Sequence, residues 1–410
     1  MKYQKLGKTD LGASVVSFGG WGIGGGSVWS DKSVNVADLE KLLDLAAELG
    51  INYIDTAPVY GTGASEQLLG EALKKGRRSK FLLQTKCSLN WRNDGGNFHY
   101  ERDGYTVNND TSARAIRKDV EDSLIRMQTD YIDVLVVHYV CKSWPVEETM
   151  GALQELIREG KIRAVGISNS KPQDLEEYEK YGTVALVQEQ FSLLAPYHGV
   201  DYFPMANQHQ TTFQVYGALE EGFLTDPCYV DRTFPKGDVR GKLPWIHEPI
   251  KGSIHKLFDV MKPLTEKYHC SYSNLVQAWT LLQNPGINLD FSIKSTMEEA
   301  GAVNRKILEF CKENGVSGNR SNLAAVCAEE MTVNIIKFGG KTSNWIDINL
   351  CLEDDICRLR IRDNGVNFNP LEYSYDHEEF DIHGIELVKK ISKSMDYIRA
   401  IDMNNTIISF

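Results

Sequence analysis

The stretch Asn52-Tyr-Ile-Asp-Thr-Ala-Pro-Val-Tyr60 decides the fold, because a short apolar run leads directly into Asp55 and Tyr60. Two further polar residues follow apolar runs in the same way, Lys86 after residues 81–85 and His138 after residues 133–137. Buried parallel strands read as such runs, with helical segments between them. In a parallel β/α barrel the carboxyl ends of the strands face the active site. We therefore expect these four side chains to converge on one mouth.

The four residue types suit the reduction of a carbonyl group. A tyrosine with a pKa near ~10 donates a proton poorly at neutral pH, but a neighbouring lysine cation favours the tyrosinate and lowers that pKa. A carboxylate keeps the lysine in place, and a neutral histidine can donate a hydrogen bond to a carbonyl oxygen. Any one of these residues alone is more often a cap or a satisfied polar group, so the prediction rests on the four together.

Strand-like and helix-like patterns alternate along most of the chain, which predicts a parallel sheet with right-handed crossovers. The expected strands cover residues 15–18, 52–56, 81–86, 133–138, 164–168, 186–191 and 212–216. The expected helices cover residues 36–48, 65–75, 111–126, 146–159, 171–181 and 271–282. Seven such units and an eighth would close a barrel. Residues 90–109 and 226–251 are expected to form long loops, which either shape substrate choice or are merely variable surface loops.

Residues 1 to about 286 resemble the aldo-keto reductases, from Tyr3-Gln-Lys-Leu-Gly onward and through Tyr60-Gly-Thr-Gly-Ala-Ser-Glu66. The resemblance implies a (β/α)8 TIM-type barrel over residues 1–287. It also implies that Asp55, Tyr60, Lys86 and His138 form a catalytic tetrad with Tyr60 as the general acid. The expected reaction is hydride transfer from NADPH to a small-molecule aldehyde or ketone.

The same resemblance implies residues that hold the cofactor. Ser168 and Asn169 match the residues that hold the nicotinamide carboxamide, Gln188 matches a further carboxamide contact, and Tyr216 falls where an aromatic ring stacks on the nicotinamide. Gly222 and Leu224 lie in the segment expected near the pyrophosphate, and Asp226 in that segment would repel it.

The eighth strand of the barrel is not supported by the pattern. Leu289, Phe291 and Ile293 alternate with polar residues, which indicates a half-exposed antiparallel strand rather than a buried parallel one. Two interpretations remain open. This strand opens a second domain over residues 288–410, or it closes the barrel and supplies the adenosine end of the cofactor site. The second interpretation would use Lys294, Ser295 and Asn304.

Three motifs mark the second domain. Glu330 and Asn334 lie four residues apart on one helical face, Asp363 and Gly365 follow a strand, and Gly384 opens a helix. In this order they resemble the boxes of the ATP-binding fold shared by histidine kinases and gyrase, most closely in the anti-sigma-factor serine kinases. The resemblance implies a two-layer α+β sandwich that binds ATP and Mg²⁺. Glu330 would be the base, Asn334 the Mg²⁺ ligand through ATP, Asp363 the adenine contact, and Gly365 and Gly384 close backbone neighbours of the nucleotide.

Composition restricts the function classes. The chain has 410 residues and a net charge of −11, of which we count six from residue 288 onward, so a basic nucleic-acid surface is not expected. No apolar run reaches the ~20 residues that span a membrane, and the first residues do not read as a signal peptide. The eight cysteines lack C-x-x-C spacing and read as reduced thiols. We expect a cytoplasmic protein with no nucleic-acid or membrane partner.

These observations leave three hypotheses. The first is a carbonyl reductase fused to a nucleotide-binding regulatory domain. The second is a regulatory serine-kinase-type protein whose ATP-binding domain acts on a protein partner, with the barrel as sensor or scaffold. The third is a truncated gene joined to its neighbour near Pro285-Gly286, with neither activity intact.

Overall fold

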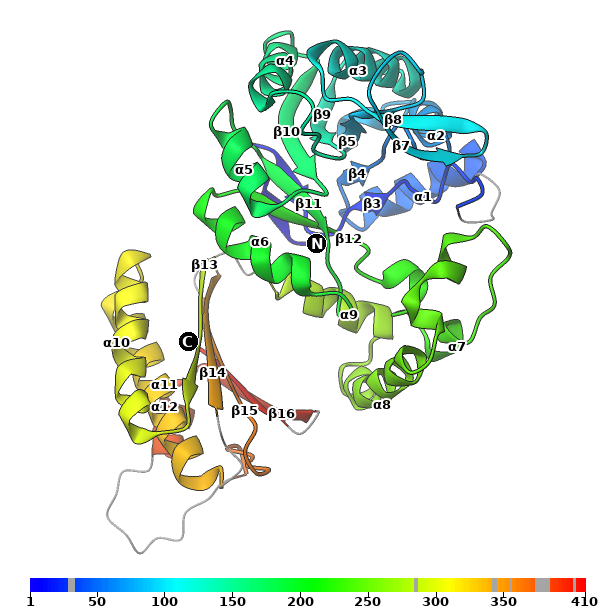
Figure 1. Cartoon of the computed structure of the whole chain (residues 1–410). Helices are drawn as coiled ribbons and strands as arrows, with labels where there is room; N and C mark the ends of the chain where they lie inside the picture. The colour runs from blue at the N-terminus through cyan, green and yellow to red at the C-terminus, as the bar shows by residue number, and fades with distance from the viewer. Residues whose placement is uncertain (29–33, 284–286, 341–344, 354–355, 373–383, 401–402) are drawn as a thin grey trace, which may run out of the picture. The chain divides into compact units, whose positions relative to one another are not determined.

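The structure is a computed structural model, and it describes residues 1–28, 34–283, 287–340, 345–353, 356–372, 384–400 and 403–410 (Figure 1). The chain divides into two compact units, Met1–Leu281 and Leu282–Phe410. Each unit has its own hydrophobic core. No helix among the described residues is long and apolar enough to cross a membrane.

The first unit is built on a curled sheet of seven parallel strands, as the alternating pattern predicts. The strands lie in the order β12-β11-β10-β9-β5-β4-β3. Their bounds are β3 Phe18–Gly19, β4 Tyr53–Asp55, β5 Leu82–Cys87, β9 Ile132–Val137, β10 Ile162–Ser168, β11 Leu186–Gln190 and β12 Thr212–Tyr216. Within the described ranges no eighth strand pairs with β3 or β12, so the sheet is barrel-like but open between these two strands.

Helices cover the outer face of this sheet (Figure 1). They are α1 Val36–Glu48, α2 Ala64–Ala72, α3 Ala113–Met127, α4 Val146–Arg158, α5 Pro172–Glu179 and α6 Tyr197–Gln208. Their apolar faces pack on the strands in one core; Leu39, Ile116 and Leu153, for example, are fully buried there. This burial is the dominant favourable contribution to the fold of the unit.

A hairpin of β1 (Tyr3–Lys5) and β2 (Gly12–Ser14) belongs to a second core cluster, inside the barrel. Leu6 and Leu11 pack there with Val134 and Leu186 from the strands. Gly7 in the connecting turn has a φ of +52°, and a Cβ at this position would lie 2.5 Å from the carbonyl oxygen of Ala185. Only glycine allows this close approach of the hairpin to the sheet.

Both segments expected to be loops contain regular structure. Residues 90–109 form most of a three-stranded antiparallel sheet of β6 Leu89–Asn90, β7 Asn97–Arg102 and β8 Tyr105–Asn109. The segment 226–251 carries the short helix α7 (Pro227–Val230), two 3-10 turns, and the start of the 19-residue helix α8 (Ile250–Tyr268), which packs with α9 (Tyr272–Leu281). Two helices are not among those expected from the sequence, α6 and α8, and each contains an internal proline, Pro204 and Pro263 respectively.

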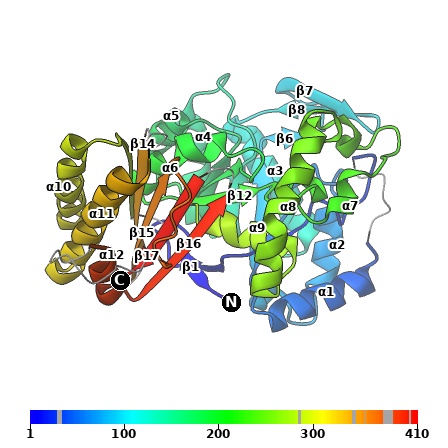
Figure 2. The same cartoon turned by 90° about the horizontal axis from the view of Figure 1, so that it is seen from below.

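The second unit is a sheet with helices on one face (Figure 2). Its strands pair antiparallel in the order β13-β14-β15-β17-β16. The elements are β13 Ile287–Lys294, α10 Met297–Glu313, α11 Gly318–Phe338, β14 Trp345–Glu353, β15 Ile356–Asp363, α12 Gly384–Ile391, β16 Ser394–Ala400 and β17 Met403–Ser409. The strand around Leu289, Phe291 and Ile293, for which two interpretations were open, is therefore β13, an edge strand of this antiparallel sheet. In it Ile293 pairs with Ile346 of β14.

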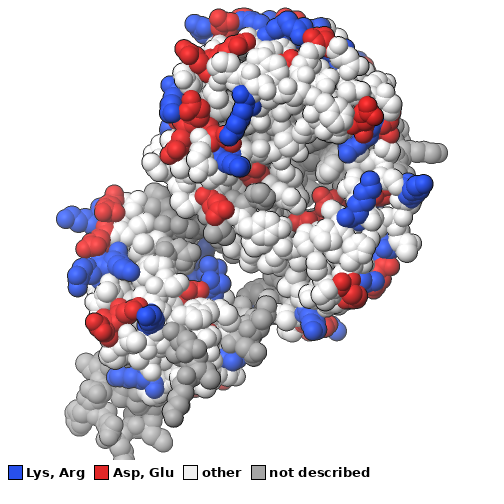
Figure 3. Space-filling view, viewed as in Figure 1, with Lys and Arg blue, Asp and Glu red and all other residues white. Residues whose placement is uncertain are grey.

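Charged side chains of both signs are mixed over the face of the molecule seen in Figure 3.

Candidate active site

The four residues singled out first lie together at the carboxyl ends of the strands. The ammonium nitrogen of Lys86, on β5, donates hydrogen bonds to Asp55 Oδ1 at 2.7 Å, to the carbonyl oxygen of Thr56 at 2.9 Å and to the hydroxyl of Tyr60 at 3.0 Å. His138 follows β9, and its ring meets the Tyr60 ring edge to face, with centroids 6.0 Å apart. The arrangement links a carboxylate, an ammonium and a phenol in one chain of contacts.

Lys86 is a buried cation. Its side chain is 1% exposed, and its ion pair with Asp55 compensates for the loss of water. Burial lowers the pKa of Lys86, but the charge of Asp55 and the contact with Tyr60 outweigh burial, so the pKa stays above its ordinary value. Lys86 is therefore charged at neutral pH.

Tyr60 does not have the lowered pKa that the sequence analysis expects. Burial raises the pKa of its hydroxyl, and the cation of Lys86 offsets only part of this effect, while Asp55 adds to it. Desolvation outweighs a single positive neighbour here, because Asp55 partly neutralises that neighbour. The Tyr60 hydroxyl therefore keeps its proton at neutral pH, as a proton donor must.

His138 is neutral in this site. Burial places the pKa of its imidazole well below the ordinary value, and the charges of Lys86 and His99 lower it further. Its Nδ1 is buried and finds no hydrogen-bond partner among the described residues. A neutral imidazole beside Tyr60 can donate one N–H to an oxygen that approaches the site.

The residues expected to hold the nicotinamide lie at the same end of the sheet. Asn169 donates from Nδ2 to the carbonyl oxygen of His138 at 2.8 Å and accepts from the hydroxyl of Tyr216 at 2.6 Å. The Ser168 hydroxyl donates to the backbone oxygen of Gln188 at 2.6 Å. Asn169 has a φ of +51°, a conformation that asparagine tolerates better than most residues. The described hydrogen bonds join these residues to one another and to the backbone of His138, and their contact with a nicotinamide stays a prediction.

The segment expected near the pyrophosphate is only partly accessible. The side chain of Leu224 is fully buried and packs with Val230, Ile254 and Phe258, so it does not face a ligand. Gly222 has a φ of +106°, and a Cβ there would meet the ring of Tyr229. Gly222 and Leu224 could therefore contact a phosphate only through their backbone groups.

The three residues expected at the adenosine end belong to the second unit. Lys294 ends β13 and pairs with Trp345 of β14, and Ser295 follows it. Asn304 on α10 donates to Glu329 on α11 at 2.8 Å. Their role in holding a cofactor stays a prediction.

Further residues that were not expected from the sequence surround the tetrad. Gln84, two residues before Lys86 on the inward side of β5, and Gln214 on β12 lie beneath Asp55. His99 comes from the hairpin of β7 and β8, and its ring centroid lies 4.5 Å from that of Tyr139, which follows His138. The alternation of inward positions on β5 and β12 could have indicated the two glutamines; no local pattern indicates that the hairpin brings His99 to the mouth.

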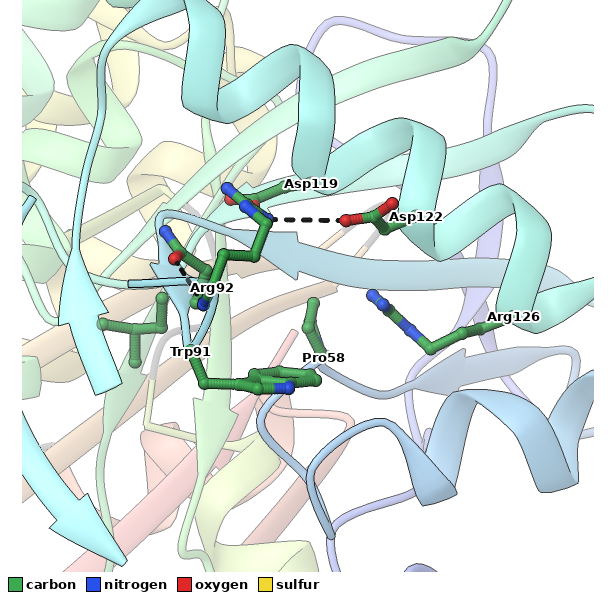
Figure 4. Close-up of a pocket in the computed structure, with 8 residues that line it drawn as sticks. Pro58, Trp91, Arg92, Asp119, Asp122 and Arg126 are labelled. Carbon is green, nitrogen blue, oxygen red and sulfur yellow. Dashed lines mark hydrogen bonds and ion pairs between the residues drawn. The ribbon is translucent and has the colours of Figure 1, made fainter. Parts of the chain in front are cut away.

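A polar cavity lies beside the loop that follows β5. It has a volume of about 90 Å³, and Trp91, Arg92, Asp119 and Arg126 are among its lining residues (Figure 4). Arg92 donates to Asp119 Oδ1 at 2.6 Å, and Asp119 Oδ2 accepts from the backbone N–H of Ser88 at 2.8 Å. Burial raises the pKa of Asp119 to about 6, although Arg92 opposes the shift. Asp119 on α3 thus connects this helix to the loop after Lys86 through its contacts with Arg92 and Ser88.

In the second unit the predicted nucleotide residues form two groups. Gly384, at the start of α12, lies against α11, where a Cβ would overlap the Glu330 carboxylate and come within 3.2 Å of Asn334 Nδ2. Asp363 is buried at the end of β15 and accepts from the backbone N–H of Gly365 at 2.8 Å and from Asn404 Nδ2 at 2.9 Å. Residues 373–383, which directly precede Gly384, lie outside the described residues.

Comparison with known proteins places the chain among reductases. The family model described as the aldo/keto reductase family matches residues 15–317, a range that runs past the first unit and includes β13 and α10. The chain is 34% identical over 292 residues to the NADH-specific methylglyoxal reductase of Escherichia coli (strain K12), covering 70% of this chain and 88% of the relative. It is 32% identical over 293 residues to aldo-keto reductase YhdN of Bacillus subtilis (strain 168), covering 70% and 83%.

The fold is shared with a solved structure as well. A glycerol dehydrogenase from Gluconobacter oxydans superposes with a TM-score of 0.60 at 33% identity, covering 69% of this chain and 83% of the other. This similarity supports a barrel-like first unit with the active-site end at the carboxyl ends of the strands.

Proposed function

The chain belongs to the aldo/keto reductase family, and we propose that it reduces a small aldehyde or ketone with Tyr60 as the proton donor. The observation that carries this proposal is the chain of contacts from Asp55 through Lys86 to the Tyr60 hydroxyl, at 2.7 and 3.0 Å. A reduced nicotinamide dinucleotide would supply the hydride. Ser168 and Asn169 would hold its carboxamide, and Tyr216 would support the face of its ring. Gln188, whose amide hydrogens go to Asp55 and Gln214, would contact the carboxamide through its amide oxygen.

The protein side of the reaction follows from the charges in the site. A carbonyl oxygen that enters between Tyr60 and His138 meets two hydrogen-bond donors, the phenol and the neutral imidazole. As negative charge grows on this oxygen, the Tyr60 proton moves to it, and the buried cation of Lys86 stabilises the phenolate that remains. Asp55 keeps Lys86 in contact with Tyr60 throughout.

NADPH is the cofactor expected from the sequence, whereas one observation favours NADH. The E. coli relative is named as NADH-specific. A 2′-phosphate needs a cation or several donors, while the 2′-hydroxyl of NADH does not. The role of Lys294, Ser295 and Asn304 at that phosphate stays a prediction.

Titration of the full-length protein with each cofactor, followed by quenching of tryptophan fluorescence, tests this proposal. Saturation by NADH at micromolar concentration, with methylglyoxal reduced in its presence, is the expected result. Tighter binding of NADPH would restore the cofactor expected from the sequence. Binding of neither cofactor would overturn the reductase proposal.

A second candidate function concerns the second unit, which we propose to be a nucleotide-binding regulatory module of the anti-sigma-factor type. The supporting observation is the contact of Gly384 with Glu330 and Asn334, because it brings a helix N-terminus, a carboxylate and an amide to one place. ATP with Mg²⁺ would bind there, and a protein partner would respond to it. Calorimetric titration with ATP and Mg²⁺ at millimolar concentration tests this module, and an absence of heat would contradict it.

A further inference from the structure

Gln214, in the middle of β12, is the centre of a hydrogen-bond network beneath the candidate active site. Its amide oxygen accepts from Gln84 Nε2 at 3.0 Å and from Gln188 Nε2 at 3.0 Å. Each of these two amides gives its other hydrogen to Asp55. Gln84 donates to Oδ1 at 2.6 Å and Gln188 donates to Oδ2 at 3.0 Å. Both oxygens of one carboxylate are thus held by amides that share one acceptor.

Tyr53 determines the orientation of the Gln84 amide in this network. Its hydroxyl is buried and donates to the amide oxygen of Gln84. Burial keeps the pKa of Tyr53 well above its ordinary value, and Asp55 and Asp133 raise it further, so the hydroxyl remains a donor. The Gln84 oxygen therefore faces Tyr53, and its nitrogen faces Asp55 and Gln214.

Burying a network of amides costs free energy of folding, so its presence here indicates a role in the candidate active site. The interior of a barrel of this kind is normally filled by branched apolar side chains. Buried amides are tolerated only when their donors and acceptors are satisfied, and removal of one partner leaves the others unpaired. Here the donors of Gln84 and Gln188 are fully used, and two of their four hydrogens go to Asp55.

We propose that Gln214 is a positioning residue, which holds Asp55 through Gln84 and Gln188 so that Asp55 in turn holds Lys86 against Tyr60. The inference rests on the proposed function, in which the contact between Lys86 and Tyr60 is needed for proton transfer. Without the shared acceptor, the two amides lose the partner that orients them, and the Asp55 carboxylate can rotate away from Lys86.

The test is a cycle of variants in the full-length protein, with methylglyoxal reduction as the readout. Gln214→Met keeps the length of the side chain and removes its hydrogen bonds. We expect kcat to fall about tenfold with little change in the KM of the carbonyl substrate, because a small misplacement of a reacting group has effects of this size or larger. In an Asp55→Asn background the same substitution should change kcat by less than about twofold, since the group that it positions is already lost.

A matched control is Gln154→Met on α4, a half-buried glutamine on the outside of the barrel, which should leave kcat unchanged. Gln84→Met replaces Gln214→Met if the latter does not fold, because it removes both a donor to Asp55 and the bond to Gln214. An unchanged kcat, or an equal loss of kcat in the Asp55→Asn background, would overturn the inference. A wild-type protein without carbonyl reduction would remove the proposed function, and the inference with it.

Discussion

The ammonium nitrogen of Lys86 lies 2.7 Å from Asp55 Oδ1 in a site where the lysine side chain is 1% exposed. A cation this deeply buried is stable only because a carboxylate and two further oxygens surround it. The pair therefore contributes to folding as well as to the proposed chemistry, and the two contributions can be separated.

Lys86→Met removes the buried cation and leaves Asp55 with the amides of Gln84 and Gln188 as partners. We expect a loss of about 3–5 kcal/mol in the free energy of unfolding of the first unit, because the carboxylate then has no opposite charge beside it. The double variant Asp55→Asn, Lys86→Met should recover most of this stability and none of the activity. Denaturant unfolding and methylglyoxal reduction measure the two effects, and recovery of activity in the double variant would contradict the assigned role of the pair.

His138→Asn tests the proposed hydrogen bond to the carbonyl oxygen. The imidazole is neutral and its ring lies beside that of Tyr60, so it can donate one N–H to a carbonyl oxygen that enters there. We expect kcat/KM for the carbonyl substrate to fall on the order of 10²-fold, since that is the usual cost of removing one such donor. Cofactor affinity should stay within about twofold of the wild type; a loss confined to cofactor binding would argue against this role.

Glu189 should make stability depend on pH. Burial raises the pKa of its carboxyl to about 7, although the backbone and side chain of Ser170 donate to it. The folded protein therefore binds this proton more tightly than the unfolded chain. The protonated Glu189 therefore stabilises the folded protein below the ordinary carboxyl pKa of about 4.5, and this stabilisation is lost as pH rises through about 7. The loss in free energy of unfolding is at most about 3 kcal/mol.

Glu189→Gln keeps an acceptor for Ser170 and removes the titration. The difference in free energy of unfolding between wild type and Glu189→Gln should grow in favour of the variant between about pH 5 and pH 8. The same substitution at the exposed Glu176 on α5 is the control and should show no such trend. Parallel pH curves for wild type and Glu189→Gln would refute this expectation.

Gly384→Ala probes the contact between α12 and α11. A methyl group would overlap the Glu330 carboxylate, so we expect α11 to be destabilised by about 1–3 kcal/mol. Gly301→Ala on α10 has open space around its Cβ and should be neutral or stabilising by about 0.5–1 kcal/mol. Hydrogen exchange of the α11 amides in the full-length protein measures the effect of each variant. Equal protection in Gly384→Ala and Gly301→Ala would contradict the close contact between Gly384 and Glu330.

Local patterns predicted much of the first unit. Each of the runs at 52–56, 81–86 and 133–138 overlaps a parallel strand, and the polar residues at their ends meet as expected. The strands could be predicted because burial on both faces of a parallel sheet requires a continuous apolar pattern. The meeting of the polar residues could be predicted because barrel geometry brings the strand ends together. The alternation at Leu289, Phe291 and Ile293 also indicated the antiparallel pairing of β13 with β14.

Features that depend on tertiary contacts were not predictable in this way. The hairpin of β7 and β8 carries polar and aromatic residues that resemble a loop, and its position over the mouth depends on contacts such as Asn97 with Ser143, at 2.6 Å. The helix α8 continues through Pro263 because its buried face, including Phe258 and Met261, packs with α9. The raised pKa of Tyr60 reflects burial, which the local sequence does not encode.

The most direct test of the reductase account compares wild type and Tyr60→Phe in the reduction of methylglyoxal, followed by the consumption of NADH and, separately, of NADPH. The account predicts turnover by the wild type with at least one cofactor. It predicts a rate lower by about 10²–10⁴-fold for Tyr60→Phe, because only the proton donor is lost while the ring and its packing remain. Equal rates for the two proteins, or no turnover by a folded wild type that binds neither cofactor, would contradict it.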